Sequence, residues 1–358
     1  MGLGRGAVAT VTPGFWTGKR VLLTGHTGFK GSWAALWLSQ MGAEVTGLAL
    51  PPDQTPSLFE MAAVERGVDS RFGDIRDPAA IDRALAGKTF DLVLHMAAQA
   101  IVRTAIEDPV AAFDTNVMGT ARLLQALRGR PDLKAVLTIT SDKVYANDDG
   151  GRAFAEGDRL GGKDPYSASK AAAEIVVQSF ARSYFPQVAV ATARGGNVIG
   201  GGDFSRDRLV VDIVRAARAG EAVTLRHPEA TRPWQHVLDC LAGYFAHLEA
   251  LATRPDTPRA LNFGPRPGGA EVTVGELATL GVEALGGRPW RHESDANSLE
   301  ARALAIDATL ARTALGFESR LDAAEAVRLT MDWYARQAAG ADARALCLEQ
   351  IEGYQARA

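Results

Sequence analysis

A glycine-rich turn between an apolar run and a helical pattern constrains the fold of this chain most. Residues Thr24–Gly31 read TGHTGFKG, follow the apolar run Arg20–Leu23 and precede a helical pattern over Ser32–Met41. In a strand–turn–helix unit, glycines let the backbone approach a diphosphate, which the first helical N–H groups and the helix dipole then hold. The alternative is a turn that only packs a helix on a strand. The position near the start of the chain favours a dinucleotide site.

Short β-rich runs alternate with helical patterns as far as Arg194. We expect strands over Arg20–Leu23, Glu44–Ala49, Val68–Phe72, Asp91–His95, Ala135–Thr140 and Val188–Ala193, and helices over Ser32–Met41, Pro78–Leu85, Pro109–Leu127 and Pro165–Tyr184. Such alternation predicts an α/β fold with a Rossmann-type, doubly wound parallel sheet. After Arg194 the pattern changes to a glycine-rich loop. We therefore expect a loose tail over residues 1–15, a dinucleotide-binding domain over 16–194 and, over 195–358, mainly a smaller C-terminal substrate-binding lobe.

The composition excludes several classes of function. The 358 residues are 47% hydrophobic with a net charge of −3, which provides a large core but not the basic field of a nucleic-acid binder. Cys240 and Cys347 lie far apart, so they form neither a disulfide framework nor a metal-ligand cluster. No apolar stretch is long enough to span a membrane, and the N-terminus lacks the apolar core of a signal peptide. We expect a cytoplasmic protein without metal, membrane or nucleic-acid partners.

The ends of the other expected strands supply candidates for cofactor binding. The fourth strand ends in HMAAQ at His95–Gln99, where small residues let the backbone pass close to a cofactor. Asp74, after the third strand, can accept from an adenine amino group, although this segment can equally serve to cap the next helix through Asp77. The second strand ends with no acid before Asp53 and no arginine, so the choice between NAD and NADP stays open on this motif.

A tyrosine and a lysine at helical spacing supply the chemistry. Tyr166 and Lys170, in YSASK, are four residues apart and therefore share one face of a helix. A neighbouring cation favours the phenolate, which can take the proton of an alcohol while its carbon loses a hydride. The spacing alone is a weak signal, since it recurs by chance in long helices. The glycine-rich turn upstream gives it weight.

A hydroxyl, a carboxylate and an amine follow the fifth strand. Ser141 can hydrogen-bond the hydroxyl that is oxidised, Asp142 can protonate a leaving hydroxyl, and Lys143 can take a proton. The alternative is a solvated turn with a surface Asp–Lys pair. Because the ligand crevice of an open α/β sheet lies beyond the carboxyl ends of its strands, we favour the catalytic interpretation.

These motifs resemble the extended short-chain dehydrogenase/reductase family over about residues 16–340. The resemblance rests on TGHTGFKG, HMAAQ, NVMGT at Asn116–Thr120 and YSASK. Within this family the chain is similar to the sugar-nucleotide dehydratases, and most to the branch acting on CDP-glucose. The segments that carry this closer similarity are Gly25–Trp33, Leu48–Glu60, Thr140–Tyr145, Arg194–Phe204 and Arg232–Asp239. Other dehydratases usually have Asp-Glu where this chain has Asp142-Lys143, and the lysine is typical of the CDP-glucose branch.

The resemblance implies tightly held NAD and the dehydration of CDP-D-glucose to CDP-4-dehydro-6-deoxy-D-glucose, with CDP-glucose as the small-molecule partner. It implies a homodimer formed by the helices over Pro109–Leu127 and Tyr166–Tyr184. The implied catalytic residues are Ser141, Asp142, Lys143, Tyr166 and Lys170. The implied cofactor-binding residues are Gly25, Thr27, Gly28, Phe29, Lys30, Gly31, Asp74, Ile75, Ala97, Ala98, Gln99, Asn116, Thr140, Tyr166 and Lys170. The implied substrate-binding residues are Arg103, Ser141, Asn197, Arg208 and Arg232.

Three alternatives remain at this stage. The first is dehydration of another sugar nucleotide, such as dTDP-glucose or GDP-mannose, because the C-terminal lobe reads the base. The second is an NAD-dependent sugar-nucleotide 4-epimerase, against which the Asp142-Lys143 pair argues. The third is a non-catalytic nucleotide-sensing protein, since fold alone does not fix function. The complete set of Ser141, Tyr166 and Lys170 argues against the third.

Overall fold

Seven parallel strands form the central sheet of the computed structural model, which describes residues 11–266, 272–293 and 304–357. Their order is β11-β7-β5-β4-β1-β2-β3, and every neighbouring pair is parallel. The strands are β1 Arg20–Thr24, β2 Glu44–Ala49, β3 Val68–Phe72, β4 Leu92–His95, β5 Ala135–Ile139, β7 Ala189–Gly195 and β11 Ala260–Phe263. The predicted doubly wound sheet is confirmed, and the expected strands agree with the observed ones to within two residues.

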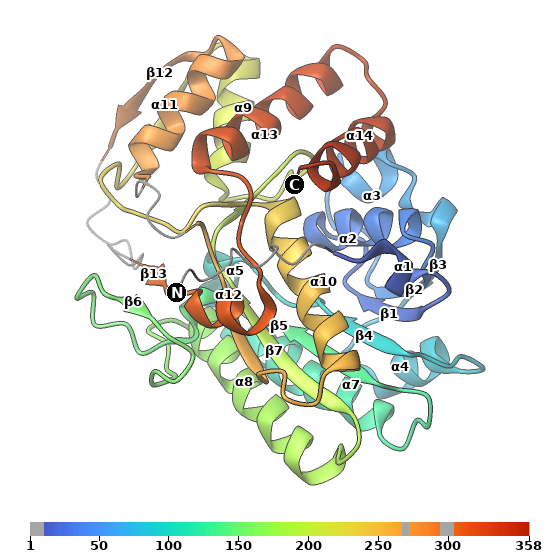
Figure 1. The fold of residues 1–358 in the computed structure, drawn as a ribbon. Helices are drawn as coiled ribbons and strands as arrows, with labels where there is room; N and C mark the ends of the chain where they lie inside the picture. Colours follow the sequence, from blue (N-terminus) through green and yellow to red (C-terminus); the bar gives the residue numbers. More distant parts are fainter. Residues whose placement is uncertain (1–10, 267–271, 294–303, 358) are drawn as a thin grey trace, which may run out of the picture.

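Helices cover both faces of the sheet. Adjacent residues of one strand belong to different hydrophobic clusters, as Val21 and Leu22 do, because strand side chains alternate between the two faces. The face of Val21 packs against α2 Phe29–Gln40 and α10 Val237–Thr253. The face of Leu22 packs against α4 Pro78–Leu85, α7 Thr120–Leu127 and α8 Pro165–Tyr184. Figure 1 shows α10 beside α2, with α7 and α8 farther down in the view.

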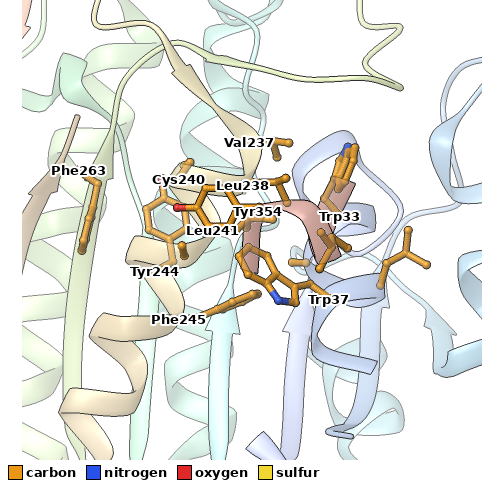
Figure 2. Packing of buried hydrophobic residues seen from close by; sticks show 14 of the residues in the cluster. Trp33, Trp37, Val237, Leu238, Cys240, Leu241, Tyr244, Phe245, Phe263 and Tyr354 are labelled. Carbon is orange, nitrogen blue, oxygen red and sulfur yellow. The ribbon is translucent and has the colours of Figure 1, made fainter. Parts of the chain in front are cut away.

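Aromatic packing fixes α2, the helix that follows the glycine-rich turn. The Trp37 ring lies 5.3 Å from the ring of Phe245 on α10 and 5.7 Å from that of Tyr354 on α14, which spans Ala343–Gln355. Trp33 and Trp37 are both fully buried, and Figure 2 shows them facing the side chains of α10. Buried aromatic rings contribute much of a core's packing energy, so α2 is held firmly against α10 and α14.

Residues after 194 contribute to both the sheet and a separate lobe. Strand β11 pairs with β7, and α10 packs on β5 and β7, so these two elements belong to the sheet layers. Helices α9 Leu209–Ala219, α11 Val274–Leu285 and α13 Ala323–Ala338 pack together at one end of the molecule, at the top of Figure 1. The sequence predicted a lobe formed mainly by residues from 195 onward and did not predict that β11 and α10 join the sheet layers. Pairing between strands so far apart in the sequence leaves no local pattern.

Short elements complete the described chain. They are α1 Pro13–Trp16, α3 Leu58–Met61, η1 Val64–Gly67, α5 Val102–Glu107, α6 Pro109–Phe113, η2 Asp114–Gly119, η3 Asp142–Val144, β6 Ala153–Phe154, β8 Val198–Ile199, β9 Ala222–Leu225, β10 Gln235–His236, β12 Arg288–His292, β13 Ala305–Ile306 and α12 Thr309–Leu315. The helix expected over residues 109–127 is thus α6 and α7 joined by the π-helical turn η2. In the described ranges, no helix has the length and apolarity needed to cross a membrane.

A short helix lies within the segment that the sequence predicted to be a loose N-terminal tail. Residues 1–10 lie outside the described residues, but Pro13–Trp16 form helix α1. Trp16 is fully buried, with its ring 5.3 Å from that of Phe245. This burial of a large aromatic side chain orders the chain before residue 16, where the sequence predicted a loose segment.

Candidate active site

The three glycines of the turn between β1 and α2 have different roles. Gly25 has a φ of +77°, and a Cβ there would lie 2.8 Å from the backbone nitrogen of Ala97, so the turn packs directly on the end of β4. A Cβ on Gly31 would lie 1.9 Å from the Gly25 carbonyl oxygen. Gly28 is exposed, and a Cβ there would meet only that carbonyl oxygen, at 3.6 Å. Two glycines therefore permit close packing, and the third leaves the N-terminus of α2 open to a diphosphate.

Replacing Gly28 by alanine is expected to weaken NAD binding about tenfold or more, a loss of roughly 1.4 kcal/mol. The added methyl group would occupy the space in front of the helical N–H groups, while the local backbone, at φ −78°, accepts alanine. Calorimetric titration of cofactor-free protein with NAD measures the change, and the melting temperature should stay the same. Gly31→Ala is the contrasting control, because its Cβ would collide with backbone and lower the melting temperature. Undiminished NAD affinity in Gly28→Ala would contradict the assignment.

Buried hydroxyl and imidazole groups hold the HMAAQ segment against this turn. The Thr24 hydroxyl oxygen accepts from the Ala97 N–H at 3.0 Å and lies 2.6 Å from His95 Nδ1. His95 Nε2 lies 3.0 Å from the Thr120 hydroxyl on α7. Burial lowers the pKa of His95 to about 3, so this imidazole is neutral at physiological pH. The ends of β1 and β4 are thereby fixed to each other.

Asn116 serves as a bridge between backbone segments. Its Oδ1 accepts from the Gln99 N–H at 2.9 Å, and its Nδ2 donates to the Gln99 carbonyl at 3.0 Å and to Ser169 Oγ at 2.9 Å. These contacts join the segment after β4, which includes Ala98, to helix α8. The expected contact of Asn116 with the cofactor stays a prediction, and the interactions observed are with protein groups.

Three more of the expected cofactor residues interact with other groups of the protein. The Thr27 hydroxyl donates to the Leu50 carbonyl at 2.9 Å, which ties the turn to the end of β2. Asp74 accepts from Arg76 Nη2 at 2.7 Å, and this guanidinium lowers the pKa of the Asp74 carboxyl. Ile75 is buried in the core, so any role in binding falls to its backbone. An adenine amino group would therefore share the Asp74 carboxylate with Arg76.

The catalytic candidates come together where β5 ends beside the start of α8. The side chain of Tyr166 interacts with that of Ser141, and the Ser141 hydroxyl donates to Asp142 Oδ1 at 2.9 Å. Lys170 Nζ donates to the Ile139 carbonyl at 3.1 Å. Ser141, Asp142 and Lys170 are all buried, and Asp142 Oδ2 has no hydrogen-bond partner among the described residues. Lys143 follows on η3, half-buried, with its backbone N–H 3.2 Å from Ser141 Oγ. A hydroxyl, a phenol, a carboxylate and an ammonium thus share one site.

Burial controls the titration of the tyrosine and the lysine. Burial raises the pKa of Tyr166, whereas the interaction with Ser141 and the charge of Arg208 lower it in part. The sequence predicted that a neighbouring cation favours the phenolate; the charge of Arg208 acts in that direction, but burial outweighs it and the pKa of Tyr166 is raised. Burial also lowers the pKa of Lys170 to about 7, with Lys30 acting in the same direction and Glu174 opposing both.

Replacing Lys170 by methionine is expected to stabilise the cofactor-free protein by about 1–4 kcal/mol, because it removes a buried charge while keeping apolar volume. The pKa of lysine is about 10.4 in the unfolded chain and about 7 for Lys170 in the folded protein. Between these two pH values the unfolded chain therefore keeps a proton that the folded protein has released. The gain should be complete below pH ~7 and fade as the pH rises toward ~10. Urea denaturation across this range measures it, with exposed Lys134→Met as the control. A destabilised variant at pH 6 would contradict the expectation.

The expected substrate-binding residues do not form one cluster as the catalytic candidates do. Arg208 influences Tyr166 electrostatically, and its buried Nε has no partner in the described part of the chain. Arg103 pairs with Asp207 at 3.3 Å. The Asn197 carbonyl accepts from the Gln235 N–H at 3.0 Å, and Arg232 Nη1 donates to the Thr231 carbonyl at 2.8 Å. The structure thus places Arg208 near the catalytic cluster, and substrate contacts by the others stay predictions.

Sequence reasoning missed a second tyrosine near the cluster. Tyr244 on α10 is fully buried, which raises the pKa of its phenol, and Asp142 and Tyr166 act in the same direction. Lys30 Nζ lies 6.0 Å from the Tyr244 ring centroid, and Figure 2 shows Tyr244 beside Cys240. Tyr244 carries no local motif, since only the packing of α10 on the sheet brings it here.

The fold and the site together define an enzyme of the short-chain dehydrogenase/reductase type, with a tyrosine and a lysine beside a dinucleotide-binding turn. The chain belongs to the NAD dependent epimerase/dehydratase family, whose model matches residues 21–264. Its cofactor is therefore NAD, which the open N-terminus of α2 fits. The family membership therefore decides between NAD and NADP, which the sequence at the end of the second strand could not do.

Relatives and solved structures agree with this membership. The chain is 40% identical to a CDP-glucose 4,6-dehydratase from Salmonella typhimurium, over 95% of this chain and 97% of that one. It is 31% identical to a dTDP-glucose 4,6-dehydratase from Streptomyces griseus, over 88% of this chain and 93% of the relative. The structure of a Thermus thermophilus UDP-glucose 4-epimerase in complex with NAD matches with a TM-score of 0.76 and 26% identity, covering 88% of this chain and 99% of that one.

Proposed function

We propose that this enzyme removes water from CDP-D-glucose to give CDP-4-dehydro-6-deoxy-D-glucose. The observation that carries the proposal is the buried cluster of Ser141, Asp142 and Tyr166, in which an acid accompanies the groups needed for oxidation. An epimerase needs the tyrosine and the lysine but no acid for a leaving hydroxyl. The similarity to the Salmonella dehydratase over nearly the full length of both chains supports the same substrate.

In the oxidation half, Tyr166 takes the proton of the sugar 4-hydroxyl, which Ser141 orients by a hydrogen bond. Lys170 lies one helical turn from Tyr166, and its ammonium favours the phenolate that takes this proton. The glycine-rich turn would hold NAD, which would supply the redox chemistry by which C4 loses a hydride and C6 gains one.

In the elimination half, the 4-ketone acidifies the proton on C5, and Lys143 removes it directly or through water. Asp142 gives a proton to the departing 6-hydroxyl, which leaves as water. The buried Oδ2 of Asp142, without a partner among the described residues, supports this assignment. A proton then returns to C5, so the net change is the loss of one water molecule.

The proposal also covers substrate contacts, the roles of the two parts of the chain, the pathway and the location. Arg208 and Arg232 would bind the diphosphate, because guanidinium groups match phosphate oxygens, and Arg103 and Asn197 would also contact the substrate. Residues 16–194 would bind NAD, and residues 195–358 would mainly bind the nucleotide sugar. The product would serve deoxysugar synthesis for surface polysaccharide. A cytoplasmic location is consistent with the two buried, unpaired cysteines.

We also propose a homodimer formed through the α6–α7 segment and α8. Large apolar side chains are exposed there, and burying them would stabilise a dimer. They are Val110, which is 76% exposed, Phe113, Met118, Ile175, which is 59% exposed, and Tyr184. Sedimentation velocity of the purified enzyme tests this, and a monomer at micromolar concentration would contradict it.

Mass spectrometry of the purified enzyme with NAD and a mixture of CDP-glucose, dTDP-glucose, UDP-glucose and GDP-mannose tests the function. Selective loss of water from CDP-glucose is the expected result. Loss from another sugar nucleotide would keep the chemistry and overturn the substrate. An isomer of unchanged mass, separated by chromatography, would favour epimerisation. No conversion with NAD bound would favour a non-catalytic role.

A further inference from the structure

A buried ion pair lies directly behind the catalytic cluster. Arg194 on β7 meets Glu174 on α8 through two contacts, Nη2 to Oε2 at 2.8 Å and Nε to Oε1 at 3.0 Å. The two side chains are 2% and 0% exposed. A buried pair costs desolvation energy and is weak support for stability by itself, so its value to the enzyme lies in what it holds in place.

The pair holds both ends of the loop that carries the elimination residues. The Thr140 hydroxyl, at the start of this loop, donates to Glu174 Oε1. Arg194 Nη1 donates to the hydroxyl oxygen of Tyr145, at the end of the loop, at 2.8 Å. Ser141, Asp142 and Lys143 lie between these two attachment points. One ion pair therefore fixes the entry and the exit of a six-residue catalytic loop.

Tyr145 is fixed from its other side as well. Its hydroxyl donates to Asn262 Oδ1 on β11 at 2.6 Å, and Asn262 Nδ2 donates to the Phe154 carbonyl at 2.9 Å. The rings of Tyr145 and Phe154 are stacked, with centroids 5.0 Å apart and planes 9° apart. The exit of the loop is thus attached to a strand that lies more than a hundred residues further along the chain.

Two of the three oxidation groups lie outside this loop, and the third, Ser141, directly follows the loop entry at Thr140 and is farther in sequence from the exit at Tyr145. Tyr166 and Lys170 project from the first turns of α8, a twenty-residue helix whose N-cap is Asp164. Asp142 and Lys143 lie on η3, a three-residue turn. A turn this short has little rigidity of its own, so its geometry follows the groups that hold its ends.

We propose that Arg194, Glu174 and Tyr145 are positioning residues that hold Asp142 and Lys143 in place for the elimination of water. The inference rests on the proposed function and adds that different residues position the groups for oxidation and the groups for elimination. Loosening the loop exit should slow elimination while leaving the oxidation of C4 largely intact. A misplacement of about 1 Å in a reacting group can slow a step by about 10²-fold.

Tyr145→Phe is the test, because it keeps the stacked ring and removes only the hydroxyl between Arg194 and Asn262. In single turnovers with CDP-glucose, absorbance of the reduced nicotinamide measures oxidation, and mass spectrometry measures loss of water. We expect elimination to slow about 10- to 100-fold and oxidation to change less than about threefold. Tyr354→Phe, on α14, is the matched control. It also removes a buried tyrosine hydroxyl, which is bonded to Asp239 at 2.7 Å and not to the catalytic loop.

The outcomes separate this inference from the proposed function. A wild-type enzyme that removes no water from any sugar nucleotide would overturn both. A working wild type with a Tyr145→Phe variant that matches Tyr354→Phe, or that loses both half-reactions equally, would overturn the positioning role alone. If Tyr145→Phe does not fold, Phe154→Leu, which removes only the stacked ring, is expected to show the same split between the half-reactions, and an equal loss would overturn the inference.

Discussion

Replacing Tyr166 by phenylalanine is expected to slow turnover of CDP-glucose by about 10²- to 10⁴-fold, the usual contribution of a general base. The change removes the hydroxyl that interacts with Ser141 and takes the sugar proton, while the ring keeps its packing against Ala105 and Ala112. Because burial raises the pKa of Tyr166, the wild-type rate should rise with pH as the phenolate forms. The variant should lose this pH dependence together with the rate. Steady-state rates from pH 6 to 10 measure both effects.

Binding of NAD provides the control for this variant. The glycine-rich turn and α2 are separate from the Tyr166 hydroxyl, so calorimetry should give an NAD affinity within about threefold of wild type. Tyr184→Phe, at the exposed end of the same helix, is the matched substitution and should leave the rate unchanged. Turnover that survives in Tyr166→Phe would rule out the proposed base.

Six of the seven strands of the sheet were predictable because each of them leaves a local pattern. Buried parallel strands are short apolar runs, so β1, β4 and β5 could be placed directly from the sequence. Helix α2 begins at Phe29, three residues before the expected start, because the glycines hide the first helical turn. The pairing of β11 with β7 could not be predicted, since it joins segments about seventy residues apart.

The site was predictable where one motif holds both partners and not where packing brings them together. The four-residue spacing placed Tyr166 and Lys170 on one helix face, as the structure has them. Tyr244 and Arg194 reach the cluster through α10 and β7, and nothing in their local sequence indicates it. Burial, which is a property of the whole fold, also outweighs the neighbouring positive charge and raises the pKa of Tyr166.

Asp142→Asn is expected to slow the loss of water by about 10²- to 10⁴-fold while the oxidation of C4 continues. Asparagine keeps the shape of the side chain and still accepts the Ser141 hydrogen bond, but it cannot give a proton to the departing 6-hydroxyl. Oxidised sugar nucleotide should therefore accumulate on the enzyme. Quenching with borodeuteride and locating deuterium at C4 by mass spectrometry measures the oxidation, while the mass of the unquenched sugar nucleotide reports the elimination.

The same variant separates dehydration from epimerisation. An epimerase uses Ser141, Tyr166 and Lys170 without an acid for a leaving group, so Asp142→Asn would leave its turnover largely intact. Asp332→Asn, on the outer part of α13 and paired with Arg336, controls for the loss of one carboxylate. Loss of both half-reactions in Asp142→Asn would instead mean that the carboxylate acts mainly by holding Ser141, because oxidation requires the serine hydroxyl and elimination requires the acid.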